Sequence, residues 1–343
     1  MAFMAGKLEA DVVLDEAALS ETPPESPGGP KKIVGRSPWQ IARSRLRRDK
    51  TSMACLVIVC AYVVVAIAAP ILQHFGVIDY YKFNPKLLSA ADGMPAGNFG
   101  GVSAAHPFGV EPQTGRDVLS RIVGGVTQSM LIASMATLFS LVLGSVIGII
   151  SGYTGKWVDF WLGRFIDLVL AFPQLLMLLA LSVVLIEKIT NLGVPAGAPS
   201  QIVYLILVLG FFGFPFFARI IRGQVLSLRE REFVEASRSL GARGYRIWFT
   251  ELLPNLWAPI LVYGTLIFPT YVSAEAALSY LGVGVPAPTP TLGNILTDSV
   301  TFLASDPMFF WLPGLAIFLL VLSANLLGDG LRDALDPKSD RSS

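Results

Sequence analysis

The sequence predicts an all-α integral membrane protein with six transmembrane helices and both termini in the cytoplasm, and three observations carry that prediction. Of its 343 residues, 53% are hydrophobic and only 15% are charged, whereas soluble domains carry about a quarter charged residues. Six apolar stretches are each long enough to cross a hydrocarbon core about 30 Å thick as a helix. Lys and Arg gather on one side of these stretches, which sets their orientation.

The expected spans divide the chain into a tail, a first helix, a long loop and a five-helix core. Residues 1–36 are expected to be a disordered cytoplasmic tail, because Pro, Gly, Ser and Glu dominate them. Residues 73–126 are expected to form an extracytoplasmic loop, residues 127–328 the core, and residues 329–343 a cytoplasmic tail. The six spans are Met53–Leu72, Ser129–Gly152, Ile166–Leu185, Ile202–Ile221, Leu256–Ala276 and Phe309–Leu327. The third, fourth and fifth spans contain Pro173, Pro215, Pro259 and Pro269, and such prolines are tolerated in membrane helices but often kink them.

Residues 37–52 are expected to form an amphipathic helix that lies in the membrane surface. Trp39, Ala42 and Leu46 share one face of such a helix, and arginines surround the rest. A segment that merely anchors the first span through its positive charges fits the same pattern equally well, so both interpretations stand.

Basic residues define the side of the membrane. Nine Lys or Arg residues precede the first span, and seven more lie from Arg219 to Arg246. The opposite side holds only five, and it is the cytoplasmic loops of membrane proteins that carry the excess of Lys and Arg. Both termini and the loop between the fourth and fifth spans are therefore predicted to be cytoplasmic, in a multi-pass protein of the cell membrane.

The composition also argues against several classes of function. A net charge of +1 gives no basic balance toward nucleic acid. Cys55 and Cys60 lie in one apolar stretch, where we expect them to pack rather than form a disulfide or a zinc site. His74 and His106 have no companion ligands, so no metal site is expected. The sequence contains no GxxxxGK(S/T) phosphate loop and no convincing Ser/His/Asp or Cys/His set, and we expect neither an enzyme site nor a bound cofactor.

The loop at residues 228–254 carries the densest pattern in the chain. Ser227 and Glu230 have the spacing of a capping box, which predicts a helix that begins at Leu228. Gly241 supplies the left-handed conformation that ends a helix at little cost, and Pro254 is expected to end a second helix. The apolar face of the first helix is Phe233, Ala236, Ser237 and Leu240, and that of the second is Tyr245, Trp248, Phe249 and Leu252.

Two apolar faces in water need something to cover them. A surface helix pair that only connects two spans is one interpretation of this loop. The bilayer or the helix bundle can cover one face, and a partner protein can cover the other by docking a helix in a groove.

The spacing within this loop resembles the EAA loop of ABC-importer permeases, which implies the type I permease fold of that family. In the family, the loop docks into a cleft on the ATPase subunit and passes nucleotide-driven motion to the membrane helices. Ser237 stands where the pattern has a second alanine, and Glu251 where it has an isoleucine. The resemblance assigns the ATPase-docking loop to Glu235, Ala236, Ser237, Gly241, Leu253 and Pro254.

Five further blocks, in order, are similar to the C-type permease subunit of the dipeptide/oligopeptide branch, from about Ser37 to Pro337. They are His106–Gly125, Gly152–Leu176, Ala218–Ala242, Ala274–Leu296 and Asn325–Pro337. The resemblance implies half of a translocation path for peptides, with nickel or glutathione as alternative substrates. It implies a second, homologous permease subunit, two ATPase subunits that carry ATP and Mg, an extracellular substrate-binding protein and membrane lipid as partners, and no nucleic acid. A homodimer remains an alternative to the heterodimer.

Two rival classes make different demands on the sequence. A secondary transporter usually shows ion-coupling carboxylates in mid-span and an internal repeat, and neither is found. A purely structural membrane scaffold would not need a glycine-punctuated docking loop. Both rivals therefore fit the sequence less well than an ATP-driven importer.

Charged residues inside the predicted spans are the last candidates, because such residues are usually functional. Arg164 and Asp167 have the i, i+3 spacing of a structural salt bridge. Glu275 lies near the outer end of the fifth span, beside a bent segment with Gly282, Gly284 and Pro286. This segment fits an outer gate, and it fits an ordinary short re-entrant turn equally well.

Overall fold

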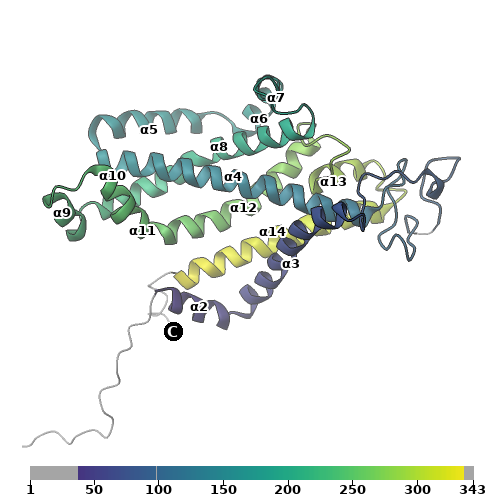
Figure 1. The fold of residues 1–343 in the computed structure, drawn as a ribbon, viewed down its shortest axis with the longest axis horizontal. Coiled ribbons are helices and arrows are strands. Elements are labelled where there is room, and N and C mark those ends of the chain that lie inside the picture. The colour runs from purple at the N-terminus through teal and green to yellow at the C-terminus, as the bar shows by residue number, and fades with distance from the viewer. Residues whose placement is uncertain (1–37, 98, 336–343) are drawn as a thin grey trace, which may run out of the picture. The chain divides into compact units, whose positions relative to one another are not determined.

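The computed structural model of the chain describes residues 38–97 and 99–335, and all regular elements among them are helices (Figure 1). The predicted tail at residues 1–36 lies outside the described residues. Five helices are long and apolar enough to cross a membrane. These are α3 (Lys50–His74), α4 (Val118–Thr154), α8 (Ala198–Leu228), α12 (Trp257–Tyr280) and α14 (Pro307–Leu335).

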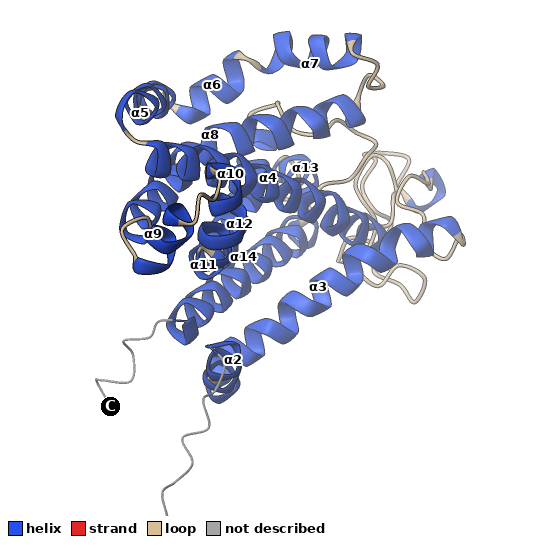
Figure 2. Ribbon diagram, turned by 60° about the vertical axis from the view of Figure 1, so that its left-hand side comes forward, coloured by secondary structure: helices blue, strands red, loops and turns tan. Residues whose placement is uncertain are grey.

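The predicted third span is broken rather than continuous. Helices α5 (Lys156–Ala171) and α6 (Gln174–Ala180) meet at a bend of 78°, and the pair is either a sixth, broken span or a re-entrant loop. The break lies at Pro173. A proline disfavours helical conformation in the residue before it, and Phe172 is accordingly extended. Figure 2 shows the chain turning between α5 and α6, and α7 (Ser182–Asn191) follows.

Helix α4 begins at Val118, eleven residues before the predicted start, so the predicted outer loop was too long at its end. The Asp117 carboxylate accepts a hydrogen bond of 2.7 Å from the Ser120 amide and caps the helix. With 37 residues, α4 is about 55 Å long. It therefore extends well past a hydrocarbon core of about 30 Å.

Helix α4 packs closely along α8 through small residues. A Cβ at Gly144 would lie 2.8 Å from the Phe217 ring, and one at Gly148 would lie 2.7 Å from the Ala218 carbonyl oxygen. Such close approach of two backbones is the usual role of glycine in membrane helix pairs. This pair forms the frame on which the rest of the bundle is built.

The other boundaries differ from prediction by shorter lengths. Helix α2 (Pro38–Arg48) precedes α3, and Asp49 separates them by accepting hydrogen bonds from the Thr51 and Ser52 amides, at 3.0 and 3.1 Å. Helix α14 runs to Leu335, so the predicted tail at 329–343 begins as helix. Helices α8 and α12 are continuous through their prolines.

Two irregular regions lie near opposite ends of the long helices (Figure 1). One contains the short elements α9, α10 and α11, between α8 and α12. The other contains α13 (Leu292–Val300) and the loop at residues 75–117, which includes a short 3-10 turn at Pro85–Leu87. The candidate functional residues gather in these two regions.

Candidate functional site

The segment between α8 and α12 is built from three short helical pieces. They are α9 (Glu232–Ser239), α10 (Gly244–Ile247) and α11 (Leu253–Asn255), with a π-helical turn at Trp248–Leu252 before α11. The predicted helix start at Leu228 is wrong. Ser227 lies in the last turn of α8, so its backbone is already helical, and α9 begins four residues after Leu228 with no side-chain cap.

Gly241 joins α9 to α10 in the predicted left-handed conformation, with φ of +80°. A Cβ built there would meet nothing within 4 Å. The position therefore demands glycine for its backbone angle and not for space, since left-handed angles are costly for most residues with a side chain.

Four fully buried side chains anchor this segment to the helix bundle. They pack with residues of α4 and α8 in one apolar cluster. The buried four are Val234, Ile247, Leu252 and Leu256, and their partners in α4 and α8 are Ile149, Phe217, Ile221 and Val225. The segment therefore shares one packed apolar cluster with α4 and α8.

Within the predicted apolar face of the second helix, Leu252 is fully buried and Trp248 is partly buried against the same cluster. Tyr245 and Phe249 are exposed, while Ile247, which was not predicted, is fully buried. The π turn explains the difference, because its extra residue changes the spacing of buried positions from four to five between Ile247 and Leu252.

The exposed side of the segment carries large apolar side chains. Leu240 is 88% exposed and Phe249 is 66% exposed. We refer to Phe233, Leu240, Tyr245 and Phe249 together as the apolar loop surface. Within the part of the chain that the structure describes, these four side chains are left exposed, so the membrane surface or a partner can cover them.

The remaining predicted residues of this loop are placed as follows. Glu235 and Ala236 are exposed on α9, Leu253 is half-buried, and Pro254 is exposed inside α11. The second helical stretch ends at Asn255, one residue after Pro254. Ser237 donates a hydrogen bond of 3.0 Å to Glu251 Oε1, and neither partner is fully exposed.

Two contacts hold α9 and its neighbours onto the end of α4. The Arg238 guanidinium lies 5.5 Å from the centre of the Tyr153 ring, within the range of a cation–π interaction. Arg229 Nη1 donates a hydrogen bond of 3.1 Å to the Gly152 carbonyl.

The predicted pair of Arg164 and Asp167 lies 3.8 Å apart on α5, with both side chains largely exposed. Asp167 has a closer partner in Arg219 of α8. A second pair links the same two helices, where the Arg222 guanidinium donates two hydrogen bonds to Asp159, at 2.5 and 2.7 Å. Sequence spacing misses both cross-helix pairs, since it reports only neighbours on one helix.

At the other end of the molecule, Glu275 is fully buried inside α12. Its carboxylate accepts hydrogen bonds of 2.9 Å from the Ser129 and Ser279 hydroxyls. The Ser129 hydroxyl also accepts the Leu292 amide of α13, at 3.0 Å. We refer to Ser129, Glu275, Ser279 and Leu292 as the Glu275 clasp, which joins α4, α12 and α13.

The segment after Glu275 is a loop that leads into α13. Gly282 has φ of +82°, and a Cβ at Gly284 would lie 2.1 Å from the Ser279 hydroxyl oxygen. Pro286 is exposed. The Asn294 amide donates to the Val285 and Thr289 carbonyls, at 3.0 and 2.8 Å, and so fixes the loop on α13.

A buried ion cluster in the loop at 75–117 was not predicted. The Glu111 carboxylate accepts from Arg116 Nε at 2.6 Å and from Arg121 Nη1 at 2.7 Å, and all three side chains are buried. Arg121 also lies 3.9 Å from Asp298 of α13. The only signal for this cluster in the sequence is the charged block after His106. The Nδ1 atom of His106 lies 2.9 Å from the Asp117 carboxylate.

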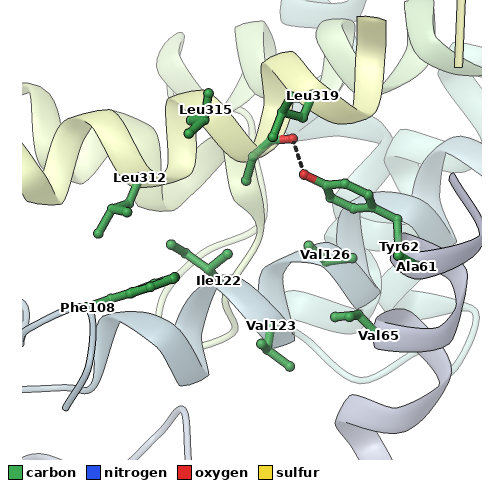
Figure 3. A pocket seen from close by; sticks show the side chains of 11 residues that line it. Ala61, Tyr62, Val65, Phe108, Ile122, Val123, Val126, Leu312, Leu315 and Leu319 are labelled. Atoms are coloured by element: carbon green, nitrogen blue, oxygen red, sulfur yellow. Dashed lines mark hydrogen bonds between the residues drawn. The ribbon is translucent and has the colours of Figure 1, made fainter. Parts of the chain in front are cut away.

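Two cavities open between the long helices, and both are walled almost entirely by apolar side chains. The smaller, of about 300 Å³, lies between α3, α4 and α14, and the Tyr62 hydroxyl donates to the Ala316 carbonyl beside it at 2.8 Å (Figure 3). The larger, of about 830 Å³, is lined mainly by α4 and α12 and also by Tyr245, Trp248, Phe249 and Leu253 of the loop. The loop therefore forms part of the wall of this larger cavity.

Among the described residues, no group of three or more His, Cys, Asp or Glu side chains is placed to hold a metal ion. The two regions instead provide an exposed surface and a structural link between helices. One region presents uncovered apolar side chains, and the other joins three helices through a buried carboxylate.

Comparison with known protein families gives two matches along the chain. Residues 144–341, more than half of the chain, match the family described as binding-protein-dependent transport system inner membrane component. Residues 37–86 match the N-terminal TM domain of oligopeptide transport permease C. The first match covers most of the core and the second covers the first span, and residues 87–143, which include the first part of α4, lie between them.

Curated relatives align over nearly the whole chain. The dipeptide transport system permease protein DppC of Alkalihalophilus pseudofirmus is 36% identical over 92% of this chain and 95% of its own length. The oligopeptide transport system permease protein OppC of Bacillus subtilis is 37% identical over 88% of this chain and 90% of its own. The glutathione transport system permease protein GsiD of Pectobacterium atrosepticum is 31% identical over 88% and 92%.

A solved structure supports the fold. The inward-facing MetNI methionine ABC transporter superposes with a TM-score of 0.50 at 20% identity, over 64% of this chain and 97% of the compared chain. At that identity the likeness concerns the arrangement of helices alone.

Proposed function

Because this chain belongs to the binding-protein-dependent transport system inner membrane components, in the dipeptide/oligopeptide branch of ABC-importer permeases, we propose that it forms half of an ATP-driven path for peptides. It is a multi-pass protein of the cytoplasmic membrane. The observation that carries the proposal is the apolar loop surface, which is exposed on one side and anchored to α4 and α8 on the other.

The loop acts as the coupling element, with the α9–α11 end of the bundle in the cytoplasm. An ATPase subunit buries the apolar loop surface, since a helix-in-groove contact is the usual way to cover such side chains. Its nucleotide-driven motion then reaches α4 and α8 through Val234, Ile247 and Leu252, which are fully buried in one cluster with residues of those two helices. ATP and Mg are bound by the ATPase subunits and not by this chain.

One docking loop in each chain implies a second permease. Alternating access needs one bundle to move against another around a central path, and a pair of ATPase subunits needs two loops. A second, homologous permease supplies the other half of the path, and an extracellular binding protein delivers the substrate. A self-paired chain would also present two loops, so the pairing has to be measured.

Peptides are the proposed substrate class, because the names of two relatives at 36% and 37% identity specify dipeptide and oligopeptide transport. The relative named for glutathione transport is 31% identical. Nickel remains the substrate class that would change the chemistry most, and a direct uptake competition between a dipeptide and nickel separates the two.

Reconstitution in liposomes tests the proposal. Purified chain, two ATPase subunits, the binding protein and the second permease should take up labelled peptide only when ATP is supplied. Omitting the second permease, or using an ATPase variant that cannot hydrolyse ATP, should abolish uptake. Uptake by this chain without the second permease contradicts the heterodimer, and uptake without ATP contradicts the proposal as a whole.

A further inference from the structure

We propose that the hydrogen bond between Ser237 and Glu251 is a brace that fixes the angle between the two halves of the docking loop. The inference rests on the proposed function, because the two halves together present the apolar loop surface to the ATPase subunit. Both residues act by positioning that surface.

The two partners lie on opposite sides of the Gly241 turn. Ser237 belongs to α9, and Glu251 belongs to the π turn that follows α10. The Ser237 hydroxyl donates to Glu251 Oε1 at 3.0 Å, across fourteen positions of sequence. The backbone of Glu251 is itself held, because the Asn255 amide donates to its carbonyl at 2.6 Å.

The first half of the loop needs such a brace more than the second does. Only Val234 is buried among the residues of α9, whereas Ile247 and Leu252 are both buried in the second half. The Gly241 turn is held by backbone hydrogen bonds from the Gly241 amide to the Arg238 carbonyl and from the Ala242 amide to the Ser237 carbonyl, at 3.0 and 3.1 Å, and glycine is the least restricted residue. Val234 and the contact of Arg238 with the Tyr153 ring hold α9 on the bundle, and the bond to Glu251 ties it to the second half of the loop.

The π turn supplies the geometry for the bond. An extra residue in the turn rotates Glu251 relative to its place on a regular α-helix. In this position its carboxylate reaches Ser237, while Tyr245 and Phe249 stay on the exposed side. These are also the two positions at which the loop departs from the EAA pattern, so the two departures contact each other.

A hydrogen bond to a charged acceptor is among the stronger kinds, and losing one partner leaves the other unmatched. Ser237→Ala and Glu251→Ile should each lower the number of peptides imported per ATP hydrolysed by about five- to tenfold. Ser237→Thr and Glu251→Gln keep a donor and an acceptor, and should stay within about twofold of the unmodified complex. The double variant Ser237→Ala/Glu251→Ile should recover much of the loss, because the pair is then apolar on both sides.

The import ratio is measured in the full complex in liposomes. Equal ratios for Ser237→Ala and Ser237→Thr would overturn the brace, as would a Glu251→Gln variant as poor as Glu251→Ile. The ratio separates positioning from simple loss of folded protein, because uptake and hydrolysis are measured on the same sample.

A second measurement tests the brace without any transport. Spin labels at positions 240 and 249, in a background without Cys55 and Cys60, report the distance between the two halves of the loop. Ser237→Ala should broaden the distribution of that distance, and Ser237→Thr should leave it unchanged. An unchanged width with Ser237→Ala overturns the brace. Failure of the unmodified complex to bind the ATPase subunit would overturn the proposed function alone.

Discussion

The Glu275 clasp and the docking loop lie near opposite ends of the same helix, α12, and they differ in what they leave unsatisfied. In the clasp, a buried carboxylate has its hydrogen-bond partners within the chain, from Ser129 and Ser279. In the loop, among the described residues, large apolar side chains such as Leu240 are left exposed. A carboxylate inside a span therefore supports the fold at one end, and we propose that the exposed apolar residues form a binding surface at the other.

Glycines in the clasp and in the loop show the same difference in packing. A Cβ at Gly293, beside the clasp, would lie 2.7 Å from Ala276 Cα and 2.8 Å from the Ser279 hydroxyl oxygen. A Cβ at Gly241, in the loop, would meet nothing within 4 Å. The first glycine serves packing between two helices and the second serves a backbone angle, so their replacement should fail in different ways.

The largest effect is expected at the clasp. Gly293→Ala should destabilise the chain by about 3 kcal/mol, because the nearest atom is backbone and cannot move aside cheaply. Thermal unfolding in detergent measures the loss. Gly163→Ala is the matched control, since this helical glycine has no neighbour within 4 Å, and its midpoint should stay the same or rise slightly. Equal effects at both positions would show that the clasp is not tightly packed.

A smaller loss of stability but a large loss of transport is expected at the joint of the loop. Gly241→Val places a branched side chain at φ of +80°, which costs about 1–2 kcal/mol and should shift the backbone of the turn. The variant should reach the membrane in normal amount while ATP-dependent uptake falls about tenfold. Gly241→Asn tolerates the same angle and should retain most of the uptake. Normal uptake by Gly241→Val would refute the role of this turn in coupling.

Much of the fold was predictable because the length of each apolar stretch can be counted in the sequence. Five of the six expected spans are single helices in the structure. The sixth is broken at Pro173, where the strength of a proline's effect depends on whether neighbours hold the helix straight. Pro215 and Pro269 show the other outcome, inside continuous helices. The early start of α4 depends on one capping residue, Asp117, which apolar length cannot reveal.

The candidate site was predictable only in part. The Gly241 conformation follows from residue type alone, and the structure confirms it. The buried set does not follow from residue type, because the π turn at Trp248–Leu252 shifts the register. Contacts between distant residues, such as Ser237 with Glu251 and Asp159 with Arg222, require the three-dimensional arrangement.

The smallest effect is expected from Asp306, which precedes α14 at the clasp end of the bundle. Burial raises the pKa of the Asp306 carboxyl above its ordinary value of 3.8. The stability linked to its protonation is fully present below pH 3.8 and is lost as pH rises through the raised pKa. Asp306→Asn should therefore flatten the pH dependence of the unfolding midpoint over this window.

The pKa of the Asp92 carboxyl is shifted in the opposite direction, so Asp92 is the control for this pH series. The hydrogen bond from the Met94 amide lowers the pKa of the exposed Asp92 carboxyl. Its contribution is present above the ordinary pKa and is lost as pH falls. A pH profile of Asp306→Asn that coincides with that of the unmodified chain would contradict the burial argument.

We propose that an ATPase subunit buries the apolar loop surface, and the affinity of that subunit for two matched variants of this chain tests the proposal. Leu240 and Leu192 are 88% and 85% exposed, and only Leu240 belongs to the loop. Replacing either by Asp should leave the thermal stability of the chain unchanged, because neither side chain is packed. Leu240→Asp should raise the Kd for the ATPase subunit at least about tenfold, since a buried unpaired charge is costly at an interface, and Leu192→Asp should leave it unchanged. Equal affinities for the two variants would show that the ATPase subunit does not bury the apolar loop surface.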